Sequence, residues 1–209
     1  LTAVGFCALR SNTTGHSNTA VGRSALVSNT IGIYNSAFGR EALKSNTTGY
    51  NNSAVGFAAL CSNTTGINNV ALGLKSLFCN TSGLANIALG TCSALCNTEG
   101  NYNIAIGFQA NCAVTTQDYN VAIGYHALKA NTQSSNIGIG WGALCVNTTG
   151  TANLTLGNFS LRNNTTGNFN VAIGNLTLDS NVSGVNNIAV GYQSLTNNTN
   201  GDSNISTGC

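Results

Sequence analysis

Eight cysteines are the residues of this sequence with the widest choice of chemistry, because they can form disulfides or bind metals. No CxxC pair occurs, and His16 and His126 fall at different positions of the repeat described below, so we expect no metal site. Cys79 and Cys96 are the best candidate disulfide, with buried free thiols as the alternative. Further candidates at adjacent positions of neighbouring repeats are Cys61 and Cys112.

Many Asn-X-Ser/Thr sequons raise the question of N-glycosylation. Asn also persists in the turn of the repeat where the sequon is broken, as at Asn97-Thr98-Glu99, so we interpret this Asn as structural first. Asn51 and Asn158 lie at irregular positions and are the better acceptors in an organism that glycosylates. The candidate glycosylation sites are Asn51, Asn158, Asn12, Asn46, Asn63 and Asn147.

Catalytic constellations are not recognisable in the sequence. The five acidic residues are scattered, and no pair recurs at a fixed position of the repeat. Neither histidine has an evident nucleophile partner. The segment Gly138-Ile139-Gly140-Trp141-Gly142 resembles a nucleotide loop only superficially, because its glycines belong to the repeat and no helix pattern follows. We therefore expect no enzymatic activity and no cofactor.

A 17-residue repeat organises the whole chain of 209 residues. Its marker is a glycine, and one 16-residue step interrupts the regular spacing before Gly140. The marker glycines are Gly5, Gly22, Gly39, Gly56, Gly73, Gly90, Gly107, Gly124, Gly140, Gly157, Gly174, Gly191 and Gly208. Seventeen residues suit one solenoid coil with two or three short strands, so the sequence predicts an all-β, parallel β-solenoid (a β-roll or β-helix) of about 13 coils, residues 1–209 forming a single repeat domain.

Each repeat begins with a strand pattern such as Thr19-Ala20-Val21-Gly22, which alternates as period 2 requires. A second short strand is expected around the leucine position, for example Leu26. A turn of the type Asn-Thr-Thr-Gly follows. The alternation places Val21 and Ala20 on opposite faces but leaves open which face is the coil interior. Exposed Val and Ile would form apolar stripes, whereas exposed Ala and Gly would form a flat surface; either favours association.

Two positions of the repeat are almost always Asn, and stacked coils bring identical amides to about 4.8 Å from one another. We expect two asparagine ladders along the solenoid axis, on a rod roughly 60 Å long. The turn ladder includes Asn46 and Asn63. The ladder before the strand consists of Asn18, Asn35, Asn52, Asn69, Asn86, Asn103, Asn120, Asn136, Asn153, Asn170, Asn187 and Asn204.

The composition excludes several classes of partner. Only 6% of the residues are charged and the net charge is +2, which is too weak for a nucleic-acid footprint. No apolar run approaches the roughly 18 residues that cross a bilayer, so we expect no membrane insertion. The chain has no initiator Met and starts and stops within the strand pattern, which favours a mature or excised segment, or subunits that stack head to tail.

The strand motif, seen at residues 120–124 and 170–174 as Asn-Val-Ala-Ile-Gly, resembles the YadA-like head repeat of trimeric autotransporter adhesins. The whole unit is similar to tail-fibre-type 17-residue β-solenoid repeats of bacteria, phages and large viruses. The resemblance covers essentially the full chain. It implies left-handed coils, a lateral trimer and a location outside the cell or on a cell or virion surface.

One region departs from the repeat. Asn111, Val114 and Gln117 replace the usual Leu, Asn and Gly, and one residue is lost around Gln133-Ser134-Ser135. Functional sites often break local rules, so a ligand-binding role is one interpretation and tolerated drift is the other. We expect a structural shaft of an extracellular fibre or filament that associates with itself, head to tail or as a lateral trimer. The alternative is an adhesin or receptor-binding head for a glycan or cell-surface receptor; an ice-binding surface is disfavoured because the paired Thr residues lie in a turn.

Overall fold

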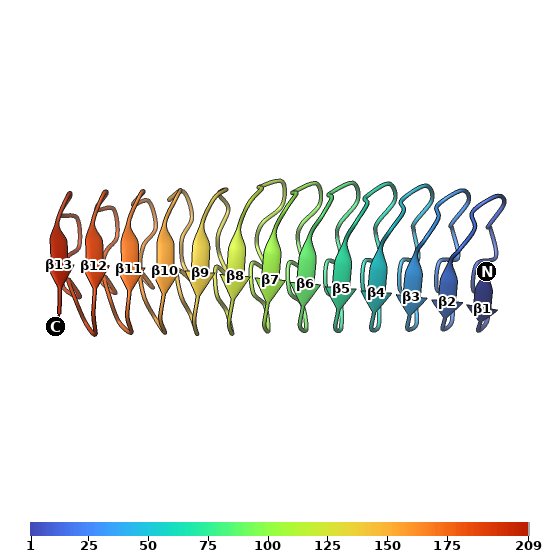
Figure 1. Ribbon diagram of the computed structural model, residues 1–209, viewed down its shortest axis with the longest axis horizontal. Coiled ribbons are helices and arrows are strands. Elements are labelled where there is room, and N and C mark those ends of the chain that lie inside the picture. Colours follow the sequence, from blue (N-terminus) through green and yellow to red (C-terminus); the bar gives the residue numbers. More distant parts are fainter. Residues whose placement is uncertain (209) are drawn as a thin grey trace.

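The computed structural model describes residues 1–208 and consists of one parallel sheet that runs along a rod (Figure 1). All thirteen strands follow one another in sequence order, and each pairs in register with the next. The predicted all-β parallel solenoid is therefore confirmed. The strands are Thr2–Val4 (β1), Thr19–Val21 (β2), Ser36–Phe38 (β3), Ser53–Val55 (β4), Val70–Leu72 (β5), Ile87–Leu89 (β6), Ile104–Ile106 (β7), Val121–Ile123 (β8), Ile137–Ile139 (β9), Leu154–Leu156 (β10), Val171–Ile173 (β11), Ile188–Val190 (β12) and Ile205–Thr207 (β13).

We number each coil by its strand, so that coil 2 is residues 18–34 and coil 8, the short one, is residues 120–135. Successive coils lie side by side along the rod, and the two ends of the chain lie at its two ends (Figure 1). Within residues 1–208 there is no helix at all, and so no helical segment suited to crossing a membrane.

The prediction of a second strand at the leucine position is wrong, because each coil has a single strand and the leucine lies in a bend. Ser24 and Leu26 both have positive φ, of 58° and 50°, so the backbone zigzags through a tight bend instead of extending. Inter-coil hydrogen bonds hold this bend, because the Ser24 amide donates to the Phe6 carbonyl and the Leu26 amide donates to the Ala42 carbonyl. A third non-glycine position, that of Tyr34, also has positive φ. Such conformations are costly for most residues and persist where the surrounding structure fixes them.

The marker glycine turns the chain at the end of each strand. At Gly39 the value of φ is 134°, a region that is essentially restricted to glycine. A Cβ atom there would also lie 2.5 Å from the carbonyl oxygen of Gly56 in the next coil. Both constraints act in coils 1 to 12, which explains why this position repeats so strictly.

The coil interior is narrow and is filled by small and medium side chains. Ala20 and Leu26 are fully buried, as are their equivalents in most coils. The Val and Ile residues on either side of the central strand residue point outward, for example Val70 and Leu72, which are 40% and 52% exposed. The structure thus settles the question that alternation left open: Ala lies inside and the branched aliphatic residues lie outside.

Two asparagines close each regular coil by converging on one carbonyl group. In coil 3, the Nδ2 groups of Asn35 and Asn46 both donate to the Gly49 carbonyl, at 2.8 and 3.0 Å. Each amide also continues along the axis: the Oδ1 atom of Asn35 accepts from the Asn52 backbone amide, and the Nδ2 group of Asn46 donates to Asn29. These side chains are fully buried, so their hydrogen bonds satisfy polar groups that would otherwise be costly.

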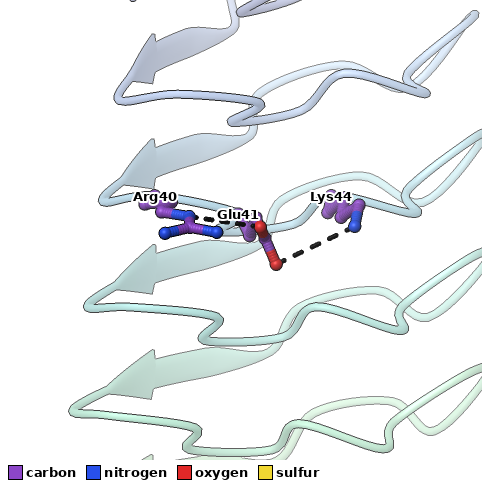
Figure 2. Close-up of polar contacts among 3 residues, drawn as sticks. All are labelled: Arg40, Glu41 and Lys44. Atoms are coloured by element: carbon purple, nitrogen blue, oxygen red, sulfur yellow. Dashed lines mark hydrogen bonds and ion pairs between the residues drawn. The ribbon is translucent and has the colours of Figure 1, made fainter.

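Charged residues contribute little to this architecture. Figure 2 shows Glu41 of coil 3 between Arg40 and Lys44, with nitrogen-to-oxygen distances of 3.2 and 3.8 Å. The only other ion pair among residues 1–208 joins Arg162 to Asp179 of the next coil. The Arg162–Asp179 pair is partly buried. Exposed pairs such as those of Glu41 typically contribute less than about 1 kcal/mol, so the ladders and the interior packing carry most of the stability.

Replacement of Leu60 by Ala tests the assignment of the interior. Leu60 is fully buried, and we expect the free energy of unfolding to fall by about 2–5 kcal/mol, as for other large-to-small core substitutions. Ile31→Ala is the control, because Ile31 is 54% exposed and its truncation is expected to cost less than about 0.5 kcal/mol. Chemical denaturation followed by circular dichroism measures both, and equal losses would contradict the inward placement of the leucine column.

Candidate functional site

The outer face of the sheet is a continuous apolar surface, which we call the strand face. It consists of the first and third residues of each strand. From β5 to β12 all of these are Val, Ile or Leu. Between β4 and β13, neither the strands nor the two residues after each strand include a charged side chain. A face of this length and uniformity is unusual on a soluble monomer and is typical of an interaction surface.

At the N-terminal end of the rod the strand face becomes more polar. Thr2, Thr19 and Ser36 occupy the first strand position in β1 to β3. Arg23 and Arg40 follow β2 and β3 at a position where coils 4 to 12 carry no charged residue. The apolar surface is thus concentrated on coils 5 to 12.

An aromatic row borders the strand face on coils 7 to 10. Its rings belong to Phe108, Tyr125, Trp141 and Phe159, with centroids 5.4, 6.1 and 5.0 Å apart along the row. Phe108, Tyr125 and Trp141 are exposed. Trp141 belongs to the glycine-rich segment of residues 138–142, which forms the end of β9 and the bend after it, so the structure has no helix N-terminus there to bind phosphate. Sequence reasoning missed the row, although three of its rings stand directly after the marker glycine of successive repeats; Phe159 lies one position further on.

The candidate glycosylation sites divide by burial. Asn46, Asn63 and Asn147 are fully buried, and their Nδ2 atoms, to which a glycan would be attached, donate hydrogen bonds within the turn ladder. Asn12 is partly buried and donates to the Gly15 carbonyl. A glycan on the three buried residues would require the coil to open.

Asn51 and Asn158 are the exposed members of that set. The Nδ2 group of Asn51 donates to Asn68 of the next coil. Asn158 uses its Oδ1 atom to accept from the Trp141 backbone amide at 2.9 Å. Their glycosylation stays a prediction.

The seven cysteines within residues 1–208 are free thiols in the structure. Cys79 and Cys96 occupy the same position of adjacent coils, and the Cys96 amide donates to the Cys112 carbonyl at 3.1 Å. The disulfide between Cys79 and Cys96, with Cys61 and Cys112 as further candidates, stays a prediction. Cys209 lies outside the described residues. No group of three side chains able to hold a metal ion occurs in the described part of the chain.

Burial keeps several of these thiols protonated at neutral pH. It raises the pKa of Cys61, Cys79 and Cys145 above the usual value. The pKa of Cys112 rises to about 11, mainly because of burial and secondarily because of the neighbouring Cys96 thiol. Since the thiolate is the reactive form, these residues act as small apolar side chains instead of nucleophiles.

Coil 7 interrupts both the core and the turn ladder. Ala94 and Asn111 replace leucine in two successive coils, and both polar atoms of the buried Asn111 side chain lack a hydrogen-bond partner among the described residues. Val114 replaces a ladder asparagine, which leaves the buried Oδ1 atom of Asn97 without a partner as well. Each unsatisfied buried group typically costs about 1–3 kcal/mol.

The turn of coil 7 also lacks the regular hydrogen bonds to coil 8, although the Asp118 amide still donates to the Ser134 hydroxyl of that coil. In regular coils, turn amides donate to a single carbonyl of the next coil, as those of Thr47, Thr48 and Gly49 donate to Thr64. In coil 7 the amides of Thr115 and Thr116 instead donate to the Oε1 atom of Gln117. The Gln side chain therefore caps its own turn locally and replaces bonds that elsewhere tie neighbouring coils together.

The turn ladder, interrupted at Val114, resumes at Asn131 in coil 8. The Nδ2 group of Asn131 donates to Asn120 and to the Gln133 carbonyl, and its Oδ1 atom accepts from Asn136 and Asn147. The shorter turn of this coil brings the two asparagine ladders into direct contact. The irregular coils therefore keep the solenoid continuous but have fewer hydrogen bonds between the turns of neighbouring coils.

Comparisons with protein-family models, with curated proteins and with solved structures find no match to this chain.

Substitution of Asn111 by Leu tests whether coil 7 is a weak point. Leu occupies this position with the same positive φ in most coils, so Asn111→Leu should fill the interior and remove two unsatisfied atoms. We expect a gain of about 1–3 kcal/mol in the free energy of unfolding, measured by chemical denaturation. The matched control, Leu77→Asn in a regular coil, should destabilise the protein. Destabilisation by Asn111→Leu would show that the amide is satisfied in solution.

Proposed function

We propose that this chain is a structural segment of an extracellular fibre or filament, a shaft of stacked β-coils that associates with copies of itself through the strand face. The observation that supports this proposal is the uncharged aliphatic surface of coils 5 to 12, whose outward side chains are half-buried or exposed. The extracellular location rests on the resemblance to adhesin and tail-fibre repeats alone.

A second copy of the chain is the partner that fits the strand face best. The face is straight and repeats about every 4.8 Å over the length of the rod, so a partner must present matching apolar groups at the same spacing. Another strand face has that spacing, and its Val, Ile and Leu side chains can interdigitate as those of packed sheets do. A lateral trimer or a sheet-to-sheet pair would both cover the exposed columns.

The absence of charge from the strands of coils 4 to 13 also bears on the mechanism of association. Burial of apolar groups, and not ion pairing, would drive the contact. Such contacts tolerate salt, whereas interactions between exposed charges are screened. Assembly that persists at high ionic strength would accord with this mechanism.

Charge introduced on the strand face should dissociate the assembly. Leu72 and Leu156 are 52% and 48% exposed, so Leu72→Glu/Leu156→Glu spares the interior but places carboxylates in the contact. We expect at least a tenfold loss of self-affinity, because desolvated or like charges cost several kcal/mol. Light scattering gives the mass, and negative-stain electron microscopy shows whether rods remain.

Ile31→Glu/Val182→Glu is the matched control, since these side chains are 54% and 41% exposed but lie on the turns. It should leave assembly unchanged. A wild-type chain that stays a compact monomer at high concentration would contradict the proposal.

The second candidate function is an adhesive or receptor-binding head, and the aromatic row of coils 7 to 10 favours it. Exposed aromatic side chains are enriched at recognition sites because they offer a large contact area at low entropic cost. The head function predicts that the purified chain binds a glycan or a cell-surface receptor and that Trp141→Ala weakens binding at least tenfold, as judged on a broad glycan array and on whole cells. Tyr34→Ala, which removes an exposed aromatic ring outside the row, is the control. Failure to bind any glycan or cell surface would count against the head.

A further inference from the structure

A groove of about 570 Å³ lies on the irregular part of the rod, on a side formed by the bends after the strands. It spans coils 6 to 9. Cys112 and Cys145 line it at a repeat position that other coils fill with the larger side chains of Phe78, Leu95 and Arg162. The lining residues are Cys96, Cys112, Ala113, His126, Lys129, Ala130, Cys145 and Val146.

The lining of the groove is apolar apart from the side chains of Lys129 and His126. Cys112 and Cys145 are protonated at neutral pH, because burial raises the pKa of both thiols. With Ala113, Ala130 and Val146 they form a wall of aliphatic carbon and neutral sulfur. Such a wall excludes strongly hydrated ligands and favours a hydrocarbon segment.

Lys129 supplies the only charge in the groove. It has no acidic partner among residues 1–208, and its ammonium group is close enough to lower the pKa values of Cys112, Cys145 and His126. Lysine at the edge of an apolar surface keeps its stem against hydrocarbon and presents its charge to a ligand. An anionic group is the complement of this arrangement.

His126 adds a neutral polar group to the same wall. Its Nε2 atom is buried and has no hydrogen-bond partner among the described residues, and burial, followed by the Lys129 charge, lowers its pKa. The ring also packs against Tyr125, with centroids 3.9 Å apart, which fixes its orientation.

We propose that this groove binds a small amphiphile with one aliphatic chain and one carboxylate, the chain lying against the thiol and alanine wall and the carboxylate pairing with Lys129. The volume lies within the range of about 300–1,000 Å³ that is usual for small-molecule sites. This binding site is independent of the proposed shaft function, because the groove does not include residues of the strand face.

Calorimetric titration of the intact chain with octanoate, decanoate and dodecanoate tests the groove. Each additional buried methylene should tighten binding by up to about fourfold, until the chain outgrows the groove. Lys129→Gln should weaken decanoate binding about tenfold and leave the binding of 1-decanol unchanged, because only the carboxylate uses the ammonium group. Lys44→Gln is the control, since Lys44 occupies the same position of coil 3.

A second pair of variants tests the apolar wall. Ala113→Leu should fill the groove and weaken decanoate binding at least tenfold, whereas Ser45→Leu, at the same position of coil 3, should not. Thermal unfolding verifies that each variant is folded. The Leu72→Glu/Leu156→Glu variant separates the groove from the strand face, because it should keep its affinity for decanoate.

Three results would each overturn the proposal: no binding of any chain length, equal affinities of wild type and Lys129→Gln for decanoate, or loss of binding only in the strand-face variant. None of them bears on self-association, which is measured without any ligand.

Discussion

The convergence of two asparagine amides on one glycine carbonyl is the interaction on which the solenoid depends. A coil of 17 residues has only three in a strand, so most of its backbone polar groups lie in bends that a sheet cannot pair. Buried groups of this kind must find partners. The amides of Asn35 and Asn46 meet at the Gly49 carbonyl and link to the neighbouring coils, which satisfies the interior of the turn and fixes the register of the stack.

The asparagine closure makes the coil interior narrow, and this explains why aliphatic side chains lie on the outer surface. Ala20 and Leu26 fill the interior, together with the two asparagines, and leave no room for a second layer of branched side chains. Val, Ile and Leu residues on both sides of each strand centre therefore face outward, although they are among the most strongly β-favouring and apolar residues of the chain. The interaction surface is thus a direct consequence of how the coil closes, which is why self-association is the function we propose.

The repeat is irregular in coils 6 to 8, and the candidate ligand-binding groove lies on this part of the rod. Val114 breaks the turn ladder, Gln117 caps its own turn, and Ala94 and Asn111 leave the core of coils 6 and 7 imperfect. The aromatic row and the groove beside Lys129 both begin in these coils and continue into coils 8 and 9. A repeat protein tolerates such a lapse because each coil contacts only its neighbours, so local loss of stability does not spread along the rod.

The sequence by itself determined the period, the parallel stack and the closing role of asparagine, because a strict 17-residue spacing brings identical residues into register whatever the path within a coil. It did not determine that path: alternation shows that Ala20 and Val21 face opposite ways but not which lies inside, and the positive φ of Leu26 has no signature in a leucine. The aromatic row was foreshadowed by repeat position, whereas the groove was not, since it depends on the relative size of side chains from four stacked coils. Only the tertiary structure decided these points, because inter-coil hydrogen bonds, and not local preference, set the direction of the bends.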